Sequence, residues 1–376
     1  MRSTPTAACE VDANIEPLDL RRNKALLEAV ERYQRTDPDH PNRKLVEQWK
    51  PNRRLQQKSP LDKATEITQQ MHLPEDRNTE VKCPGPPPWN SLYTADMRTT
   101  LLDKTANKNT TPNILKLCAY ETIDNYPKSA IQAFTDGSAF KATTFAGYGI
   151  YLKYPDNTSL DWNEPCGSVC SNYIAEIRAI TTAVKIVHQQ FETGERTPTD
   201  LIVFSDSKSA LQALENQHDS RQQEIKELAQ SINSLHESYK TRIVLQWIPG
   251  HADIAGNEKA DHLAKKGARM EQPNLPVSQE TVKQILRNNI KEEWLNCWTK
   301  GTTDRAVYTE MVKQNPKDNI GQMHRADQCT IFQLRTGHNK LNYHLNKLNP
   351  QHPHCADIVL IHMRQQNTSF WSAQGW

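Results

Sequence analysis

The sequence predicts an α/β domain over residues 126–271, built on a mixed five-stranded sheet with flanking helices. Two apolar runs, 201–204 (LIVF) and 243–248, have the hydrophobic character of buried parallel strands. Farther upstream, an Asp-Gly turn signal lies between two apolar segments and indicates an antiparallel hairpin. Segments with helical spacing alternate with the later strands, as expected when helices cover the faces of a sheet.

The first three strands are expected to be antiparallel neighbours. A strand at 131–135 leads into the turn signal Asp136-Gly137, and 147–154 (GYGIYLKY) is a suitable hairpin partner. A third strand is predicted near 159–162. These strands come before any helical pattern in the domain, so they form the first part of the sheet.

The helices follow, interleaved with the two buried strands. Ser171 and Asn172 supply capping chemistry for a helix over 174–190, which places apolar residues on one face. A second helix is predicted at 209–214, directly after the first buried strand, and a closing helix at 257–270 after the second.

The N-terminal flank, residues 1–112, is predicted to be largely linker. An amphipathic helix is expected at 18–36, where the apolar residues have approximately helical spacing. After it, residues 37–112 are rich in Pro, Asn, Lys and Thr, and 83–88 (CPGPPP) is incompatible with a helix or an interior strand.

The C-terminal flank is predicted to be a helical tail over 277–350, beginning with an amphipathic helix at 277–298. The final segment, 351–376, is expected to be a truncated or frame-shifted end. It contributes His352, His354 and Cys355 but no further cysteine, so no zinc site is predicted.

Composition argues against secreted and membrane proteins. The chain has 376 residues, a formal net charge of +2 and a mean hydropathy of −0.78. It offers neither a signal-peptide core nor an apolar stretch long enough to span a bilayer. Its eight cysteines have no framework spacing and are expected to be buried thiols. We therefore expect an intracellular protein, in the nucleus or cytoplasm, without membrane association.

Four carboxylates stand beside the predicted strands and helices: Asp136 in FTDGS, Glu176 in AEIRA, Asp206 in FSDSKSAL and Asp261 in GNEKADHLA. Each alone has an ordinary explanation, as a turn residue, a partner of a helix dipole, an N-cap or a surface helix residue. Acidic groups next to apolar strands are costly unless something neutralises them, and a divalent metal site does so. Such a site can hydrolyse phosphodiesters, which indicates a nuclease.

Five segments, FTDGS, SNYIAE, FSDS, WIPGH and GNEKADHLAK, occur together in the order found in the type 1 ribonuclease H family, which cuts the RNA strand of RNA/DNA hybrids. The resemblance covers about residues 129–269. More narrowly, the chain resembles the ribonuclease H region of a non-LTR (jockey-like) retrotransposon reverse transcriptase polyprotein. In that reading, the chain is a C-terminal fragment and residues 1–112 are a remnant of the connection that follows the polymerase.

The resemblance implies a ribonuclease H-like fold and roles for particular residues. Asp136, Glu176, Asp206 and Asp261 would hold two Mg²⁺ ions, for which Mn²⁺ can substitute. His251, after WIPG, matches a mobile histidine that helps the product phosphate leave or relays a proton. These five are the expected catalytic residues.

The expected partner is an RNA/DNA hybrid, recognised by shape through its 2′-hydroxyls rather than by base sequence. The residues whose positions suit substrate contacts are Gly137, Ser138, Ser171, Asn172 and Asn257. The chain departs from the family pattern in two places. Ala252-Asp253 follows His251 where related retrotransposon domains have Ser-Gly, which is expected to stiffen the loop and to add an anion near the metals. Tyr173 replaces an Asn that contacts RNA in cellular relatives.

Two alternatives to an active hybrid ribonuclease remain at this point. One is a catalytically silent, nucleic-acid-binding remnant of a retroelement, in which the altered loop or the loss of neighbouring domains has stopped hydrolysis. The other is a DNA-cutting transposase or integrase with a similar fold, although the histidine followed by GNEKAD disfavours it.

Overall fold

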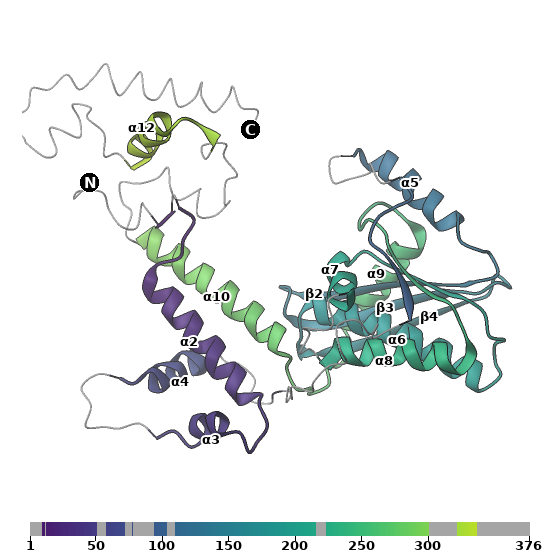
Figure 1. Ribbon diagram of the computed structural model, residues 1–376, viewed down its shortest axis with the longest axis horizontal. Coiled ribbons are helices and arrows are strands. Elements are labelled where there is room, and N and C mark those ends of the chain that lie inside the picture. Colours follow the sequence, from purple (N-terminus) through teal and green to yellow (C-terminus); the bar gives the residue numbers. More distant parts are fainter. Residues whose placement is uncertain are drawn as a thin grey trace, which may run out of the picture. The chain divides into compact units, whose positions relative to one another are not determined.

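The computed structural model describes residues 10–11, 13–50, 58–71, 77, 94–103, 110–215, 223–300 and 322–336. Clustering of the chain separates two compact units, residues 25–287 and residues 1–24 together with 288–376. The larger unit contains the whole predicted α/β domain (Figure 1). No described helix is long and apolar enough to cross a bilayer.

A mixed sheet forms the centre of the larger unit, with strand order β1-β6-β5-β2-β3-β4. The four strands from β1 to β2 in this order are parallel, and β2, β3 and β4 are antiparallel. The bounds are β1 Ala95–Arg98, β2 Ile131–Phe140, β3 Thr144–Lys153, β4 Ser159–Val169, β5 Leu201–Ser205 and β6 Ile243–Trp247. All five predicted strands are confirmed.

The prediction of five strands was nevertheless one too few. Strand β1 lies in the segment that we predicted to be linker and pairs in parallel with the edge of β6. Its four residues, ADMR, are too short and too polar to give a strand signal. Strand β1 forms because the edge of β6 offers backbone hydrogen-bonding groups to pair with. The local sequence of β1 does not reveal this pairing.

The predicted turn at Asp136-Gly137 was also wrong. Both residues lie inside β2, and the chain reverses at residues 141–143, where Lys141 and Ala142 have φ of 49° and 66°. Gly137 is needed for close packing instead: a Cβ there would lie 2.5 Å from the backbone nitrogen of Glu176. The glycine serves a contact with a helix, not a turn.

Helices cover both faces of the sheet. On one face, α6 (Asn172–Glu192), α7 (Lys208–Glu215) and α8 (Gln223–Tyr239) bury apolar residues against the strands in one cluster. On the other, α5 (Pro112–Asp124) and α9 (Ala255–Ala268) pack on a second cluster that includes Phe134, Phe204 and Val244 (Figure 1). The predicted helices at 174–190, 209–214 and 257–270 are thus confirmed, each with slightly different ends. Cys166 and Cys170 are buried free thiols, as expected.

Short helices occur in the N-terminal flank where only linker was predicted. They are α3 (Pro41–Glu47) and α4 (Pro60–Gln70), and the amphipathic helix predicted before them is α2 (Leu18–Gln34). Helix α4 begins with a reciprocal capping box between Ser59 and Asp62. Its buried Ala64 joins Leu27, Val277, Val282 and Leu286 in a small core, so packing stabilises a segment whose own pattern is weak.

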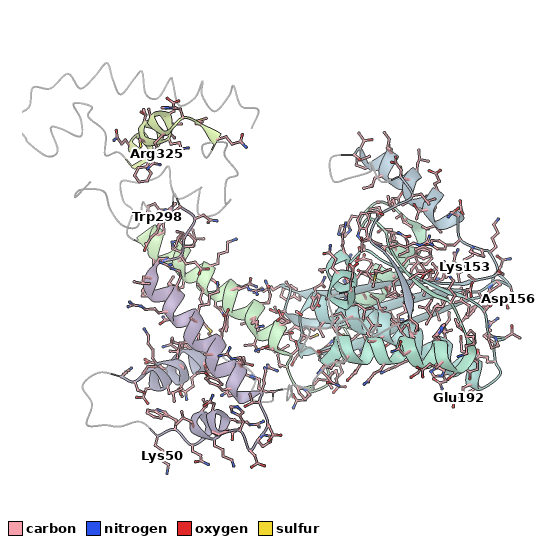
Figure 2. The ribbon with its side chains drawn as sticks, in the orientation of Figure 1. Lys50, Lys153, Asp156, Glu192, Trp298 and Arg325 are labelled. Carbon is pink, nitrogen blue, oxygen red and sulfur yellow. The ribbon has the colours of Figure 1, made fainter. Side chains whose placement is uncertain are left out.

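Helix α10 (Gln279–Lys300) confirms the helix predicted at 277–298, and α12 (Arg325–Thr336) follows it. In the smaller unit, Trp294 and Trp298 of α10 are buried with Val11, Leu20 and Ile290. Trp298 is labelled in Figure 2. The expected truncated or frame-shifted end at 351–376 lies outside the described residues.

Candidate metal centre

Two of the predicted carboxylates stand side by side because the parallel pairing between β2 and β5 ends one residue before each of them. Thr135 of β2 is paired with Ser205 of β5, and it is the last pair between these strands. Asp136 and Asp206 each follow one residue later. Side chains at the carboxyl ends of neighbouring parallel strands occupy a common edge of the sheet, which is a usual position for a site in such folds.

Glu176 lies in α6, the first of the helices that cover one face of the sheet, and its side chain approaches Asp136 and Asp206. Ser171 caps this helix by accepting a hydrogen bond from Ile174 N at 3.3 Å, which fixes where the first turn begins. Because Gly137 has no side chain, the backbone of this turn passes directly over β2. The carboxylate of Glu176 is thereby brought to Asp136 and is only 5% exposed.

The oxygens of Asp136, Glu176 and Asp206 lie within 4.8 Å of one another. Burial, together with the neighbouring negative charges of Asp206 and Asp261, raises the pKa of Asp136 to about 8. Burial and then Asp136 and Asp206 likewise raise the pKa of Glu176 well above its ordinary value, although hydrogen bonding from Gly137 opposes the shift. The protein alone does not compensate the charge of this cluster.

The cluster fits a divalent cation. Among the described residues, Glu176 Oε2 has no hydrogen-bond partner although it is buried. A buried carboxylate oxygen without a donor is costly, and a cation satisfies it. Carboxylate oxygens are also the ligands that Mg²⁺ and Mn²⁺ prefer. Asp136, Glu176 and Asp206 are therefore suited to hold such an ion.

Asp261 lies near this cluster without joining its inner group. Its charge raises the pKa of both Asp136 and Asp206. However, its carboxylate is partly exposed and forms an ion pair with Lys265 Nζ at 2.6 Å, one turn along α9. A role of Asp261 as a metal ligand consequently remains a proposal, in which the cation would compete with Lys265.

Asn257 and His251 both act on Asp206. Asn257 is buried and its Nδ2 donates to Asp206 Oδ2 at 3.4 Å, so it orients the carboxylate rather than offering a free surface to substrate. His251 is exposed, and its charge lowers the pKa of Asp206 against the larger effect of burial. Its position beside the cluster suits the expected histidine role.

The remaining predicted substrate contacts differ in accessibility. Ser138 is half-buried and Asn172 is exposed, so both side chains are open to a ligand. Ser171 is buried and its hydroxyl serves as the cap of α6. Gly137 is covered by α6, and its contribution is the close approach described above. Ser171 and Gly137 thus have clear structural roles at this edge of the sheet.

Sequence reasoning missed two residues that shape the site. A Cβ on Gly250 would lie 2.5 Å from Asp206 Oδ2, so the backbone before His251 passes against the carboxylate. Trp247 Nε1 donates to the backbone oxygen of Asp206 at 3.2 Å. The segment WIPGH contained the signal for both, but its spacing alone could not show that they contact Asp206.

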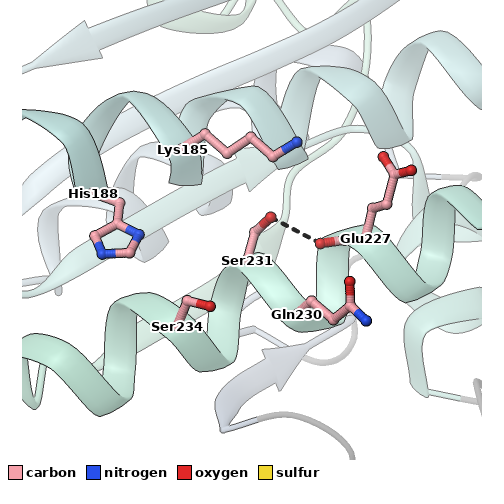
Figure 3. A pocket seen from close by; sticks show the side chains of 6 residues that line it. All are labelled: Lys185, His188, Glu227, Gln230, Ser231 and Ser234. Carbon is pink, nitrogen blue, oxygen red and sulfur yellow. Dashed lines mark hydrogen bonds between the residues drawn. The ribbon is translucent and has the colours of Figure 1, made fainter.

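A separate groove lies between α6 and α8 (Figure 3). Its lining residues are Lys185, His188, Glu227, Gln230, Ser231 and Ser234. Ser231 donates its hydroxyl to the backbone oxygen of Glu227 at 2.8 Å, an ordinary bond within a helix. The groove shares no residue with the acidic cluster, and all six of its lining residues belong to α6 and α8.

Comparison with known proteins identifies the domain that carries this cluster. Residues 128–269 match the family described as RNase H. Ribonuclease HI of Helicobacter pylori is 30% identical over 144 residues, which are 37% of this chain and 93% of that protein. The chain belongs to the ribonuclease H family. Ribonuclease H of Saccharomyces cerevisiae is 28% identical over 166 residues, but the match spans only 47% of the yeast protein and 38% of this chain.

Solved structures include similar ribonuclease H domains. RNase H1 from Halobacterium salinarum is 19% identical, with a TM-score of 0.30, and covers 37% of this chain and 96% of that one. LC11-RNase H1, solved in complex with an RNA/DNA hybrid, is 18% identical and has the same TM-score. The match covers 36% of this chain and 97% of LC11-RNase H1. The residues that match the ribonuclease H family, 128–269, lie in the middle of the chain, with further residues on both sides.

Metal binding to this ribonuclease H domain is expected to release protons. In the metal-free protein the pKa of Asp136 is about 8, so this group is mainly protonated at pH 7, whereas a cation requires the carboxylate. The apparent affinity for Mg²⁺ should rise with pH between 6 and 8, by at least roughly tenfold per unit, because the pKa values of Asp136 and Glu176 are both raised and each carboxylate must lose its proton to bind the cation. Calorimetric titration in buffers of different ionisation enthalpy measures the proton release, and an affinity independent of pH from 6 to 8 would contradict it.

Proposed function

We propose that the chain is a metal-dependent endonuclease that cleaves the RNA strand of RNA/DNA hybrids. One observation carries the proposal: in a domain of the ribonuclease H family, the structure brings the carboxylates of Asp136, Glu176 and Asp206 within 4.8 Å of one another. Asp136 lies within β2, Asp206 follows the end of β5, and Glu176 is near the start of α6. The burial of these three acids has no structural benefit of its own.

Asp136, Glu176 and Asp206 would hold the metal, with Asp261 at the edge of the same site. We propose two Mg²⁺ ions, replaceable by Mn²⁺, in line with the four acids. When bound, such ions supply charge neutralisation for the phosphate and activation of water. The neighbouring residues do the rest: Asn257 orients the Asp206 carboxylate, and His251 stands on the exposed side, where it can exchange a proton with the departing group.

Cleavage by the full-length chain is the direct test. With Mg²⁺ or Mn²⁺, the RNA strand of a labelled hybrid should be cut, whereas duplex DNA, single-stranded RNA and the hybrid in chelator should stay intact. Asp206→Asn keeps the shape but removes a ligand charge, so it should lower the rate by at least about 1000-fold without unfolding the protein. A variant that cleaved as fast as the parent would contradict the site assignment.

The same assay decides between an active enzyme and a silent binding remnant. A folded parent chain that bound the hybrid in a gel-shift assay but never cut it would favour the remnant. The ion pair between Lys116 and the Asp253 carboxylate partly offsets the added negative charge, which is one of the reasons for silence considered above.

We further propose that the chain derives from a non-LTR retrotransposon and acts inside the cell, in the nucleus or cytoplasm. The five linked sequence segments support the origin. The buried thiols of Cys118, Cys166 and Cys170 are consistent with a reducing compartment. Fractionation of cells expressing a tagged chain tests the location.

A further inference from the structure

The loop that carries His251 is held by a contact with Asp206 and by two residues buried in the core. On the inner side, Gly250 lies against Asp206, as described above. Beyond it, buried and exposed residues alternate: Ala252 and Ile254 are buried in the second core cluster, whereas His251 and Asp253 are exposed. The loop between β6 and α9 is thus fixed by apolar anchors.

The exposed residues of this loop have a left-handed backbone. His251 and Asp253 have φ of 52° and 55°, a region that is uncommon for residues other than glycine, although Asp and His adopt it more readily than most. Such a conformation persists only where surrounding contacts impose it. A glycine would adopt this backbone conformation without such contacts, whereas Asp253 benefits from a contact outside the loop.

Helix α5 supplies that contact. Lys116 Nζ forms an ion pair with the Asp253 carboxylate, across 137 positions of sequence. The apolar side of the same helix, at Cys118, Ala119 and Ile123, packs in the core cluster that contains Ala252 and Ile254. Helix α5 lies at Pro112–Asp124, outside residues 128–269 that match the family.

A second bond from α5 fixes the start of α9. Ile254 precedes α9 and has no side-chain oxygen to cap it, which leaves the first N–H groups of the helix without partners. The Tyr120 hydroxyl accepts a hydrogen bond from Ala255 N at 3.1 Å and takes the place of a cap. Helix α9 carries Asn257 and Asp261, so this hydrogen bond is made at the start of the helix that contains both site residues.

We propose that α5 is a positioning element of the active site, in which Lys116 and Tyr120 hold the His251 loop and the start of α9 in the arrangement that hydrolysis requires. This inference rests on the proposed function. Neither residue touches the metal cluster or stands where substrate is expected, so both act through the loop. The catalytic unit of this chain accordingly begins at α5, upstream of the residues that match the family.

The test uses the full-length chain and hybrid cleavage. Lys116→Ala and Tyr120→Phe are each expected to lower kcat by about 3- to 10-fold while KM changes less than about twofold, because alignment of the site is lost but the surface for the hybrid is kept. Lys116→Arg preserves the ion pair and should restore kcat. Lys128→Ala, which removes an exposed positive charge just beyond α5, is the matched control and should behave as the parent.

Coupling to His251 separates positioning from general stabilisation. In a His251→Ala background, Lys116→Ala should change kcat by less than about twofold, since residues that act through one group are not additive. If Lys116→Ala instead lowered kcat equally in both backgrounds, or if kcat were unchanged in the parent background, the proposal would be overturned.

Hydrogen exchange provides a readout that does not need activity. The Ala255 amide should exchange at least about tenfold faster in Tyr120→Phe than in the parent, because its acceptor is gone. Equal protection would overturn the positioning role even if the parent chain cleaved hybrids. A parent chain that never cleaved would refute the proposed function, while faster Ala255 exchange would still support the hold of α5 on the loop.

Discussion

Asp136→Asn is expected to lower hybrid cleavage by at least about 1000-fold and, at the same time, to stabilise the metal-free protein at pH 8. The two effects have one cause. The carboxylate at this position is buried beside other carboxylates, which suits a cation but is unfavourable without one. Asparagine keeps the size of the side chain and cannot ionise.

The stability effect has a definite dependence on pH. The pKa of Asp136 is raised from 3.8 to about 8 in the folded protein, by burial first and then by Asp206 and Asp261. A raised pKa in the folded state means that the contribution to stability is fully present below about pH 4 and is lost as the pH rises to about 8. The gain from Asp136→Asn should be near zero at pH 4 and on the order of 5 kcal/mol at pH 8, since each pKa unit corresponds to about 1.4 kcal/mol.

Thermal or urea unfolding at both pH values, in chelator, measures this difference. Asp161→Asn is the matched control, because Asp161 is an exposed residue paired with Lys259 at 2.7 Å. It should change the free energy of unfolding by less than about 0.5 kcal/mol and leave cleavage intact. If Asp136→Asn destabilised the metal-free protein at pH 8, the claim that burial of this carboxylate is unfavourable would be wrong.

Gly149→Ala is expected to destabilise the protein by about 3 kcal/mol or more and to displace α9. Gly149 lies opposite Asp136 in the β2–β3 pairing, on the strand over which α9 passes. A Cβ at this position would lie 2.2 Å from the backbone oxygen of Ala260 and 2.4 Å from the backbone nitrogen of Ala264. Backbone atoms cannot rotate away as a side chain can, so the helix must move.

The displacement should also reduce activity, because Asp261 is the next residue after Ala260. Misplacement of a site residue by about 1 Å can cost roughly 100-fold in rate. The control is Gly194→Ala: Gly194 has φ of 71° but nothing within 4 Å of a Cβ. That variant should lose only about 1 kcal/mol from backbone strain and keep its activity. Urea unfolding and kcat of the folded fraction distinguish the two, and equal losses would contradict the steric argument.

Local patterns predicted most of the ribonuclease H domain. The buried strands β5 and β6 and the helices α6, α7 and α9 were visible because apolar spacing within a segment reports which face is buried. Strand β1 and the α3 and α4 helices were not predicted, since each is short and depends on the surface that it meets. The Asp136-Gly137 pair was misinterpreted for a related reason: the glycine is required by α6, which lies some forty positions later.

The sequence by itself determined the order of the four acids along the chain and predicted that they share a site, because each stands in a short segment with its own recognisable surroundings. Only the tertiary structure decided how they are used. Register between β2 and β5 places Asp136 beside Asp206, and the missing side chain of Gly137 admits Glu176. Asp261 forms an ion pair with Lys265, and Lys116 of α5 forms one with Asp253 of the His251 loop, 137 positions later in the sequence. Apart from the Asp261–Lys265 pair, which lies within α9, these contacts join segments that are distant along the chain, so their distances depend on packing, which no local motif encodes.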